Sequence, residues 1–198
     1  MSIRVTIIVA SNRAAAGIYE DTSGPILVDG LTTLGHQVDG PVVVPDGEPV
    51  GDAIKQAIAN GADVVITSGG TGISPTDRTP QITKTLIEYE IPGIAEALRG
   101  YGATKVPSAV LSRGIAGVAG RTLIVNLPGS TGGAKDGLAV LGPILNHAVD
   151  QLKGGDHASS HAHAPARPGP THAQDPAAGH HAQDPAAGHH AQEGGDQG

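Results

Sequence analysis

Residues 62–72 read Ala-Asp-Val-Val-Ile-Thr-Ser-Gly-Gly-Thr-Gly, a short apolar run that ends in a glycine-rich turn. We expect residues 62–67 to form a strand, because a short run of nearly continuous apolar residues is typical of a strand covered by helices on both faces. The glycines allow a tight turn where the strand ends, since they have no Cβ atom. The stretch therefore predicts an inner strand of an α/β sheet.

Strand and helix patterns alternate on both sides of this run. The other expected strands are residues 3–10, 37–44, 115–118 and 122–125, and the expected helices are residues 23–34, 49–60, 80–89, 92–101 and 131–153. Alternation of this kind implies a mostly parallel sheet with right-handed crossovers. A hairpin around Gly120 adds a small antiparallel component. We predict a three-layer, doubly wound α/β domain over residues 1–153, with helices on both faces of the sheet.

The composition limits the kinds of partner. The chain of 198 residues has a net charge of −7, no cysteine and only three aromatic residues, and its Lys and Arg residues form no basic patch. We therefore expect no nucleic-acid partner and no disulfide or thiolate site. The apolar run at residues 3–10 contains Arg4 and is too short for a membrane span, so it predicts a strand rather than a signal peptide. The expected compartment is the cytoplasm, with no membrane partner.

Residues 154–198 differ sharply from the rest of the chain. They hold eight of the ten histidines and no Ile, Leu, Val or aromatic residue, and residues 172–180 and 181–189 repeat the same nine-residue sequence. We expect this tail to be disordered, because it has no apolar surface to bury. Its histidine pairs could bind Zn²⁺, Ni²⁺ or Cu²⁺, or be an incidental feature of low-complexity sequence. One alternative is therefore a metal-handling protein whose tail is the functional part.

Four expected strands end in polar or glycine-rich loops, at residues 11–13, 45–47, 68–72 and 126–130. Ligands of open α/β sheets bind at the carboxyl ends of the strands, so we expect these loops to share one edge of the sheet. The loop at residues 68–72 could present backbone N–H groups to an anion. It matches neither the Walker loop nor the dinucleotide fingerprint, and an ordinary tight turn is the alternative.

Two aspartates accompany these loops. Mg²⁺ in proteins is often held by one or two carboxylates together with substrate phosphates, so Asp46 and Asp77 are candidate ligands. Asp46 could instead belong to an ordinary Pro-Asp-Gly turn, and Asp77 could help to begin the helix at Pro80.

Three further polar residues have two interpretations each. Arg13 and Arg113 could pair with phosphate oxygens or lie in solvent. Ser130 could cap the last helix or help to bind an anion at its N-terminus.

The motifs at residues 67–72, 74–80, 111–113 and 126–130, in this order, resemble those of the Mog/MoaB family, whose relatives include gephyrin. The resemblance runs from Ile3 to about Leu152. It implies a homotrimer that transfers AMP from ATP to the terminal phosphate of molybdopterin with Mg²⁺, releasing pyrophosphate during molybdenum cofactor synthesis. A molybdenum-insertion enzyme is the implied partner. A catalytically silent MoaB-like protein that binds a pterin or a nucleotide is the alternative.

The resemblance also implies site residues. It implies that Asp46 and Asp77 bind Mg²⁺ and act in catalysis, and that Ser112 and Ser74 lie on the molybdopterin side. The implied phosphate and nucleotide site consists of Ser68, Gly69, Gly70, Thr71, Gly72, Arg13, Pro128, Gly129 and Ser130.

Overall fold

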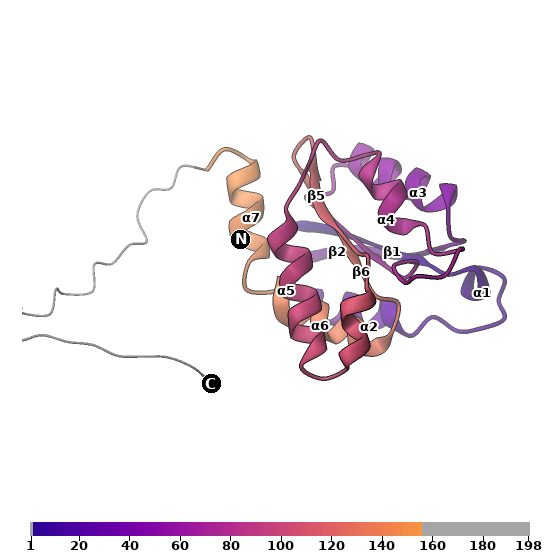
Figure 1. Cartoon of the computed structure of the whole chain (residues 1–198). Coiled ribbons are helices and arrows are strands. Elements are labelled where there is room, and N and C mark those ends of the chain that lie inside the picture. Colours follow the sequence, from indigo (N-terminus) through magenta and orange to yellow (C-terminus); the bar gives the residue numbers. More distant parts are fainter. Residues whose placement is uncertain (1, 156–198) are drawn as a thin grey trace, which may run out of the picture. The chain divides into compact units, whose positions relative to one another are not determined.

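A computed structural model describes residues 2–155, so nearly all of the expected tail lies outside the described residues. The sheet has six strands in the order β2-β1-β3-β6-β5-β4 (Figure 1). The parallel strands are β1 (Arg4–Ala10), β2 (Gln37–Val44), β3 (Val64–Ser68) and β6 (Thr122–Leu127). Two short strands, β5 (Ala116–Ala119) and β4 (Tyr89–Glu90), continue the sheet in antiparallel pairings. The predicted fold class is confirmed.

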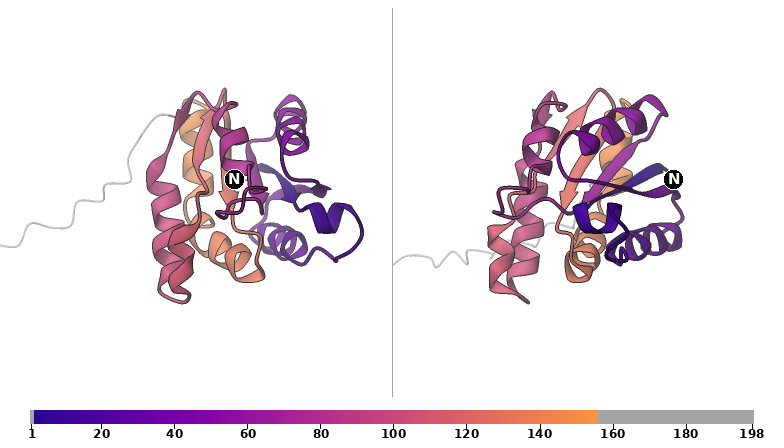
Figure 2. Two further views of the ribbon diagram at one scale, coloured as in Figure 1. Left: turned by 45° about the vertical axis from the view of Figure 1, so that its right-hand side comes forward. Right: turned by 90° about the vertical axis from the view of Figure 1, so that its right-hand side faces the viewer.

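Helices cover both faces of the sheet. The helices are α1 (Asn12–Ala15), α2 (Ser23–Thr33), α3 (Glu48–Ala59), α4 (Thr79–Lys84), α5 (Pro92–Ala103), the 3₁₀ helix η1 (Pro107–Leu111), α6 (Thr131–Leu141) and α7 (Leu145–Leu152). Helices α2, α5, α6 and α7 share one apolar cluster with the sheet, and α3 contributes to the cluster on the opposite face. Figure 2 shows the same layers from two further directions.

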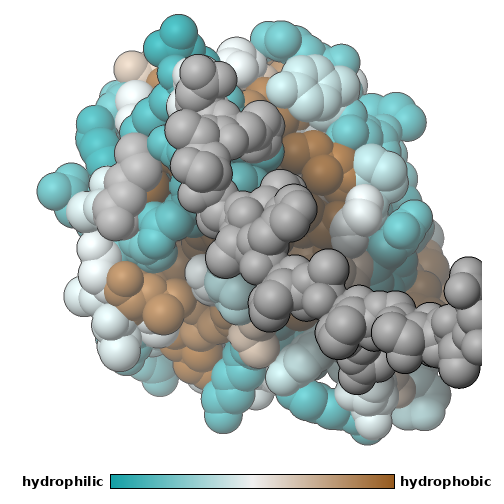
Figure 3. Space-filling model, turned by 90° about the vertical axis from the view of Figure 1, so that its left-hand side faces the viewer, coloured by the Kyte–Doolittle hydropathy of each residue, from teal (hydrophilic) through white to brown (hydrophobic). Residues whose placement is uncertain are grey.

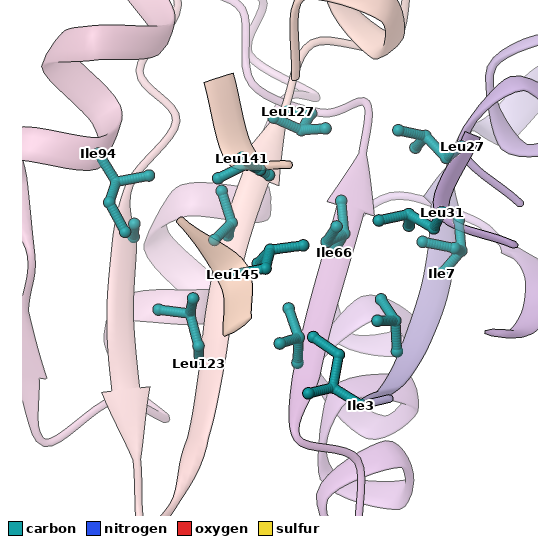
Figure 4. Close-up of a cluster of buried hydrophobic side chains, with 14 of the residues drawn as sticks. Ile3, Ile7, Leu27, Leu31, Ile66, Ile94, Leu123, Leu127, Leu141 and Leu145 are labelled. Carbon is teal, nitrogen blue, oxygen red and sulfur yellow. The ribbon is translucent and has the colours of Figure 1, made fainter. Parts of the chain in front are cut away.

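The strand residues alternate between these two clusters. On β3, Val64 and Ile66 point toward α2, α6 and α7, and Val65 between them points toward α3. Figure 4 shows Ile66 among the side chains of Leu31 and Leu145, all fully buried. Burial on both faces explains why residues 64–66 are continuously apolar.

Two expected helices are corrected by the structure. The expected helix over residues 80–89 ends at Lys84, and Tyr89–Glu90 pair with β5 instead. The expected helix over residues 131–153 is interrupted between Leu141 and Leu145. Pro143 lies in the interruption, where its missing N–H group and its ring prevent a continuous helix.

The start of α2 is capped by a residue that precedes the helix. The Thr22 side chain caps nothing, and the Asp21 carboxylate instead accepts hydrogen bonds from the N–H groups of Ser23 (3.0 Å) and Gly24 (3.1 Å). At the other end, Gly35 adopts φ +86°, as a glycine that closes a helix commonly does. Within the described part of the chain, no helix has the length and apolar character needed to cross a membrane.

Candidate functional site

A cavity of about 920 Å³ lies at the carboxyl ends of the parallel strands. The chain passes from β1 outward to β2 and then returns to the other side of β1 as β3, so the strand order reverses beside β1. Such a reversal is where open α/β sheets usually bind ligands. All four expected loops contribute to the cavity wall, and α5, η1 and α6 form its far end. The sequence therefore located this edge of the sheet correctly.

The loop after β3 packs against its neighbours through glycine. Gly69 has φ +101°, and a Cβ atom at this position would lie 2.2 Å from the Ala10 carbonyl oxygen at the end of β1. A Cβ atom at Gly129, which follows β6, would lie 3.0 Å from the Gly69 Cα. The ends of β1, β3 and β6 thus meet so closely that these positions have no room for side chains.

The next glycines bring both candidate carboxylates against the same loop. Gly70 has φ +64°, and a Cβ atom there would lie 2.5 Å from Asp46 Oδ1 and 2.2 Å from Thr79 Oγ1. A Cβ atom at Gly72 would lie 2.7 Å from Asp77 Oδ2. The carboxylates of Asp46 and Asp77 therefore border one short backbone segment, although they are 31 residues apart in the sequence.

Two oxygen atoms in this wall have no partner. Asp46 Oδ1 and the hydroxyl oxygen of the fully buried Thr79 make no hydrogen bond with any described residue. Burial without a partner is costly for such groups. Burial also raises the pKa of Asp46, a backbone hydrogen bond from Asn12 offsets this in part, and the charge of Asp77 raises it further. An Asp46 carboxylate in this position is suited to meeting a cation or a hydrogen-bond donor of a ligand.

The two carboxylates suit Mg²⁺ better than they suit a metal ion whose ligands all come from the protein. Within residues 2–155 there is no group of three or more His, Cys, Asp or Glu side chains that could hold a metal ion. Mg²⁺ commonly takes one or two carboxylates and completes its shell with water and phosphate oxygens. Asp46 and Asp77 are the residues that would hold it.

Asp77 is fixed by its own loop. The Ser74 N–H group donates to Asp77 Oδ2 at 3.1 Å, and the Ser74 hydroxyl lies 3.0 Å from that of Thr76. The alternative role of Asp77 as a helix cap finds no support, since Arg78 precedes α4 without any side-chain cap. Ser74 does not contribute to the lining of the cavity. Its polar contacts are with Asp77 and Thr76.

Arg113 holds the glycine-rich loop from behind. Its Nε donates to the Gly72 carbonyl at 2.6 Å, its backbone N–H donates to the Thr71 carbonyl at 2.8 Å, and its Nη2 donates to the Asp77 carbonyl. Two of the three guanidinium nitrogens of Arg113 thus bind backbone carbonyl groups of the loop. Because Arg113 binds these carbonyl groups, it restrains the backbone between Thr71 and Asp77.

The expected serines line the cavity but also make structural contacts. Ser130 Oγ accepts from the Gly133 N–H group at 3.0 Å and so caps α6, whose N-terminus faces the cavity. The buried Ser68 hydroxyl lies 2.9 Å from the hydroxyl of Ser23, to which it donates.

Arg13 and Ser112 both line the cavity. The Arg13 guanidinium lies 5.6 Å from the centre of the Tyr19 ring, as in a cation–π contact. Ser112 Oγ accepts from the Gly114 N–H group at 3.3 Å. Thr71 and Pro128 complete the expected set in the lining.

Sequence reasoning missed several cavity residues. Asn12 accepts from the Asp46 N–H group at 3.1 Å, and Arg99, Lys105 and Asp136 line the far end. The pattern of α6 places Asp136 on the polar side of an amphipathic helix, which usually means solvent. Only the packing of α5 against α6 reveals that this side faces the cavity.

Comparison with known proteins identifies relatives of this chain. The family model described as "Probable molybdopterin binding domain" matches residues 6–147. A molybdenum cofactor biosynthesis bifunctional protein of Chlorobaculum tepidum is 43% identical over 157 residues, covering 78% of this chain and 50% of that protein. The chain therefore spans about half the length of that relative.

Shorter relatives match over most of their length. A molybdopterin adenylyltransferase of Pyrococcus furiosus is 38% identical, with 72% of this chain and 89% of that protein covered. The solved Mog protein of Mycobacterium ulcerans superposes with a TM-score of 0.71 at 51% identity, covering 76% of this chain and 99% of that chain.

Replacement of Gly70 by alanine tests the close contacts of the loop. Gly120 is the matched control, because its φ of +60° is similar but a Cβ atom there meets nothing within 4 Å. Both variants carry the cost of a positive φ, roughly 1–2 kcal/mol. Gly70→Ala should lower the free energy of unfolding by about 1–3 kcal/mol more than Gly120→Ala, since Thr79 and Asp46 must move. Urea denaturation measures this difference in the free energy of unfolding. Equal losses in the two variants would show that Thr79 and Asp46 move without an energetic cost.

Proposed function

Because the chain belongs to the molybdopterin-binding domain family of the Mog and MoaB proteins, we propose that it transfers AMP from ATP to the terminal phosphate of molybdopterin. Pyrophosphate is the second product, and the reaction prepares molybdopterin for metal insertion during molybdenum cofactor synthesis. One observation carries the proposal: two carboxylates from separate loops border a glycine-rich segment in a cavity of about 920 Å³.

The reaction needs alignment and charge compensation more than proton transfer. A terminal phosphate oxygen of molybdopterin forms a new bond to the α-phosphorus of ATP, while the bond from that phosphorus to the bridging oxygen breaks. The electron pair leaves with pyrophosphate. The attacking phosphate is already ionised at neutral pH, so no general base is required. The main obstacle is repulsion between two anions, which preorganised dipoles and cations oppose.

Different residues of the cavity would provide the alignment and the charge compensation. The loop Gly70–Gly72 and the N-terminus of α6 would bind phosphate oxygens through backbone N–H groups, whereas the Gly69 N–H group donates to the Leu127 carbonyl at 3.0 Å. Arg113 keeps the loop in place, and Ser74 orients Asp77. Asp46 and Asp77 would hold Mg²⁺, which, when bound, neutralises phosphate charge. Arg13 would add positive charge beside the nucleotide.

The remaining site residues extend the same pocket. We propose that Ser68, Pro128, Gly129 and Ser130, which line the cavity, shape the nucleotide end, and that Ser112, also in the lining, contacts molybdopterin. We further propose that residues 1–153 form the active domain and that residues 154–198 take no part in the transfer.

We also propose that the chain acts as a homotrimer and passes its product to a molybdenum-insertion enzyme in the cytoplasm. Apolar surface is exposed on the side that carries α5 and α7 (Figure 3). Among the large hydrophobic side chains, Tyr101 of α5 is 41% exposed and Val110 of η1 is 59% exposed. Contact between copies would remove such surface from water. Sedimentation equilibrium of the full chain should give the mass of three chains, and the mass of one chain would contradict the trimer.

Pyrophosphate release from Mg-ATP in the presence of molybdopterin tests the activity. Asp46→Asn and Asp77→Asn should each lower turnover about a hundredfold or more, because each removes a negative charge that would hold the metal and the phosphates in place. Asp52→Asn is the control, since Asp52 is an exposed residue of α3 whose carboxylate pairs with Lys55 at 3.3 Å. It should retain full turnover.

Other outcomes favour the alternatives. A silent binding protein would bind molybdopterin or ATP and release no pyrophosphate above background. A metal-handling protein would bind transition metals through residues 154–198 and would likewise transfer no AMP. Unchanged turnover in either cavity variant would remove that aspartate from the mechanism.

A further inference from the structure

The far end of the cavity differs chemically from the phosphate end. It lies between α5, η1 and α6, and its walls include the apolar side chains of Leu98, Val106 and Leu111. Val106 and Leu111 are 55% and 52% exposed, although they border a cavity. Gly102 on α5 lets η1 approach closely, since a Cβ atom there would lie 2.9 Å from the Ala109 Cβ. Such walls suit a flat ring better than a phosphate.

A carboxylate stands among these apolar walls. Asp136 lies on α6, its side chain is 15% exposed, and its Oδ1 forms an ion pair with Nζ of Lys105. Its Oδ2 lies near the backbone of α5, 3.7 Å from where a Gly102 Cβ atom would be. Because 52% of the Lys105 side chain is exposed, solvent screens this pair and it contributes little stability. Stability alone gives little reason for a carboxylate here.

The position of Asp136 also opposes a phosphate at this end. A carboxylate accepts hydrogen bonds and does not donate them, so it repels phosphate and favours a ligand edge that carries donors. Asp136 follows Ser130 by six residues, which places it roughly 9 Å along α6 from the phosphate end. A ligand that spans the cavity would therefore have a phosphate at one end and a flat group with N–H donors at the other.

We propose that Asp136, oriented by Lys105, recognises the 2-amino and N3–H groups of a pterin ring whose faces lie against Leu98 and Val106. The inference rests on the proposed function and names the residue that selects the pterin. The two donors are adjacent on the ring, and a carboxylate pairs with two parallel donors in the same way as it pairs with the arginine fork. Lys105 occupies one acceptor position of Oδ1 and leaves the others to the ring.

The adenine ring of ATP is the competing occupant. Its edge offers one amino donor beside a ring nitrogen that only accepts, so one carboxylate oxygen would face an acceptor. Adenine therefore complements the Asp136 carboxylate less well than a pterin does.

Binding of two ring compounds to the full chain tests the proposal. The probes are 6-hydroxymethylpterin and 6-hydroxymethyllumazine, which has a carbonyl oxygen in place of the 2-amino group, each followed by its own fluorescence. The unchanged protein should prefer the pterin. Asp136→Asn should weaken pterin binding about ten- to a hundredfold, because it loses a charge-assisted pair of hydrogen bonds. It should also reduce or reverse the preference, since an amide can donate to the lumazine carbonyl.

The control is Asp52→Asn, which removes an equally charged, Lys-paired carboxylate from an exposed helix far in sequence from α6. Its pterin affinity and ring preference should equal those of the unchanged protein, and ATP affinity should be unchanged in both variants. Equal pterin affinity and preference in Asp136→Asn would overturn the role of Asp136 alone. A selective loss of ATP affinity would assign this end to adenine and also overturn it. Absence of pterin binding by the unchanged protein would instead contradict the proposed function, and the inference with it.

Discussion

The backbone of Gly69 lies against the Ala10 carbonyl, where a Cβ atom would come within 2.2 Å of the oxygen, and the rest of the site depends on this close approach. It joins the ends of β1 and β3 at the point where the strand order reverses, and Gly129 brings the end of β6 to the same place. The loops that follow β1, β3 and β6 can then share one cavity, because none of them places a side chain at the point where they meet. Glycine at these positions lets an anion approach the backbone closely.

The close approach of these loops also explains where the charged residues lie. Asp46 and Asp77 come from different loops, yet both meet the glycine segment, and Arg113 binds that segment from behind. Buried oxygens of Asp46 and Thr79 remain without partners among residues 2–155, so this wall is complete only when something else supplies a cation or donors. At the far end, the Asp136 carboxylate instead favours a neutral ring that carries hydrogen-bond donors. The cavity thus has two chemically distinct ends, as a ligand with a phosphate and a heterocycle would require.

Much of the fold was predictable from the sequence because burial on both faces leaves a strong pattern, as at residues 64–66. The rule that ligands bind at the carboxyl ends of the strands also predicts the edge of the sheet that holds the cavity. The errors arose where distant contacts decide the structure: Tyr89–Glu90 form a strand because β5 lies beside them, and Pro143 divides a pattern that otherwise suits one helix. Arg113 and Asp136 were beyond prediction for a similar reason. A local pattern shows that a charge is present, whereas only the packing of loops and helices shows which groups it meets.

Transfer of an isotopic label from ATP tests the central claim most directly. The full chain is incubated with molybdopterin, Mg²⁺ and ATP that carries ³²P in either its α- or its γ-phosphate. The account predicts that the α-label appears in the pterin product in equal amount to the pyrophosphate released, and that the γ-label appears only in pyrophosphate. A γ-label in the pterin product, or no label there from either position, would contradict the assignment of this cavity to AMP transfer.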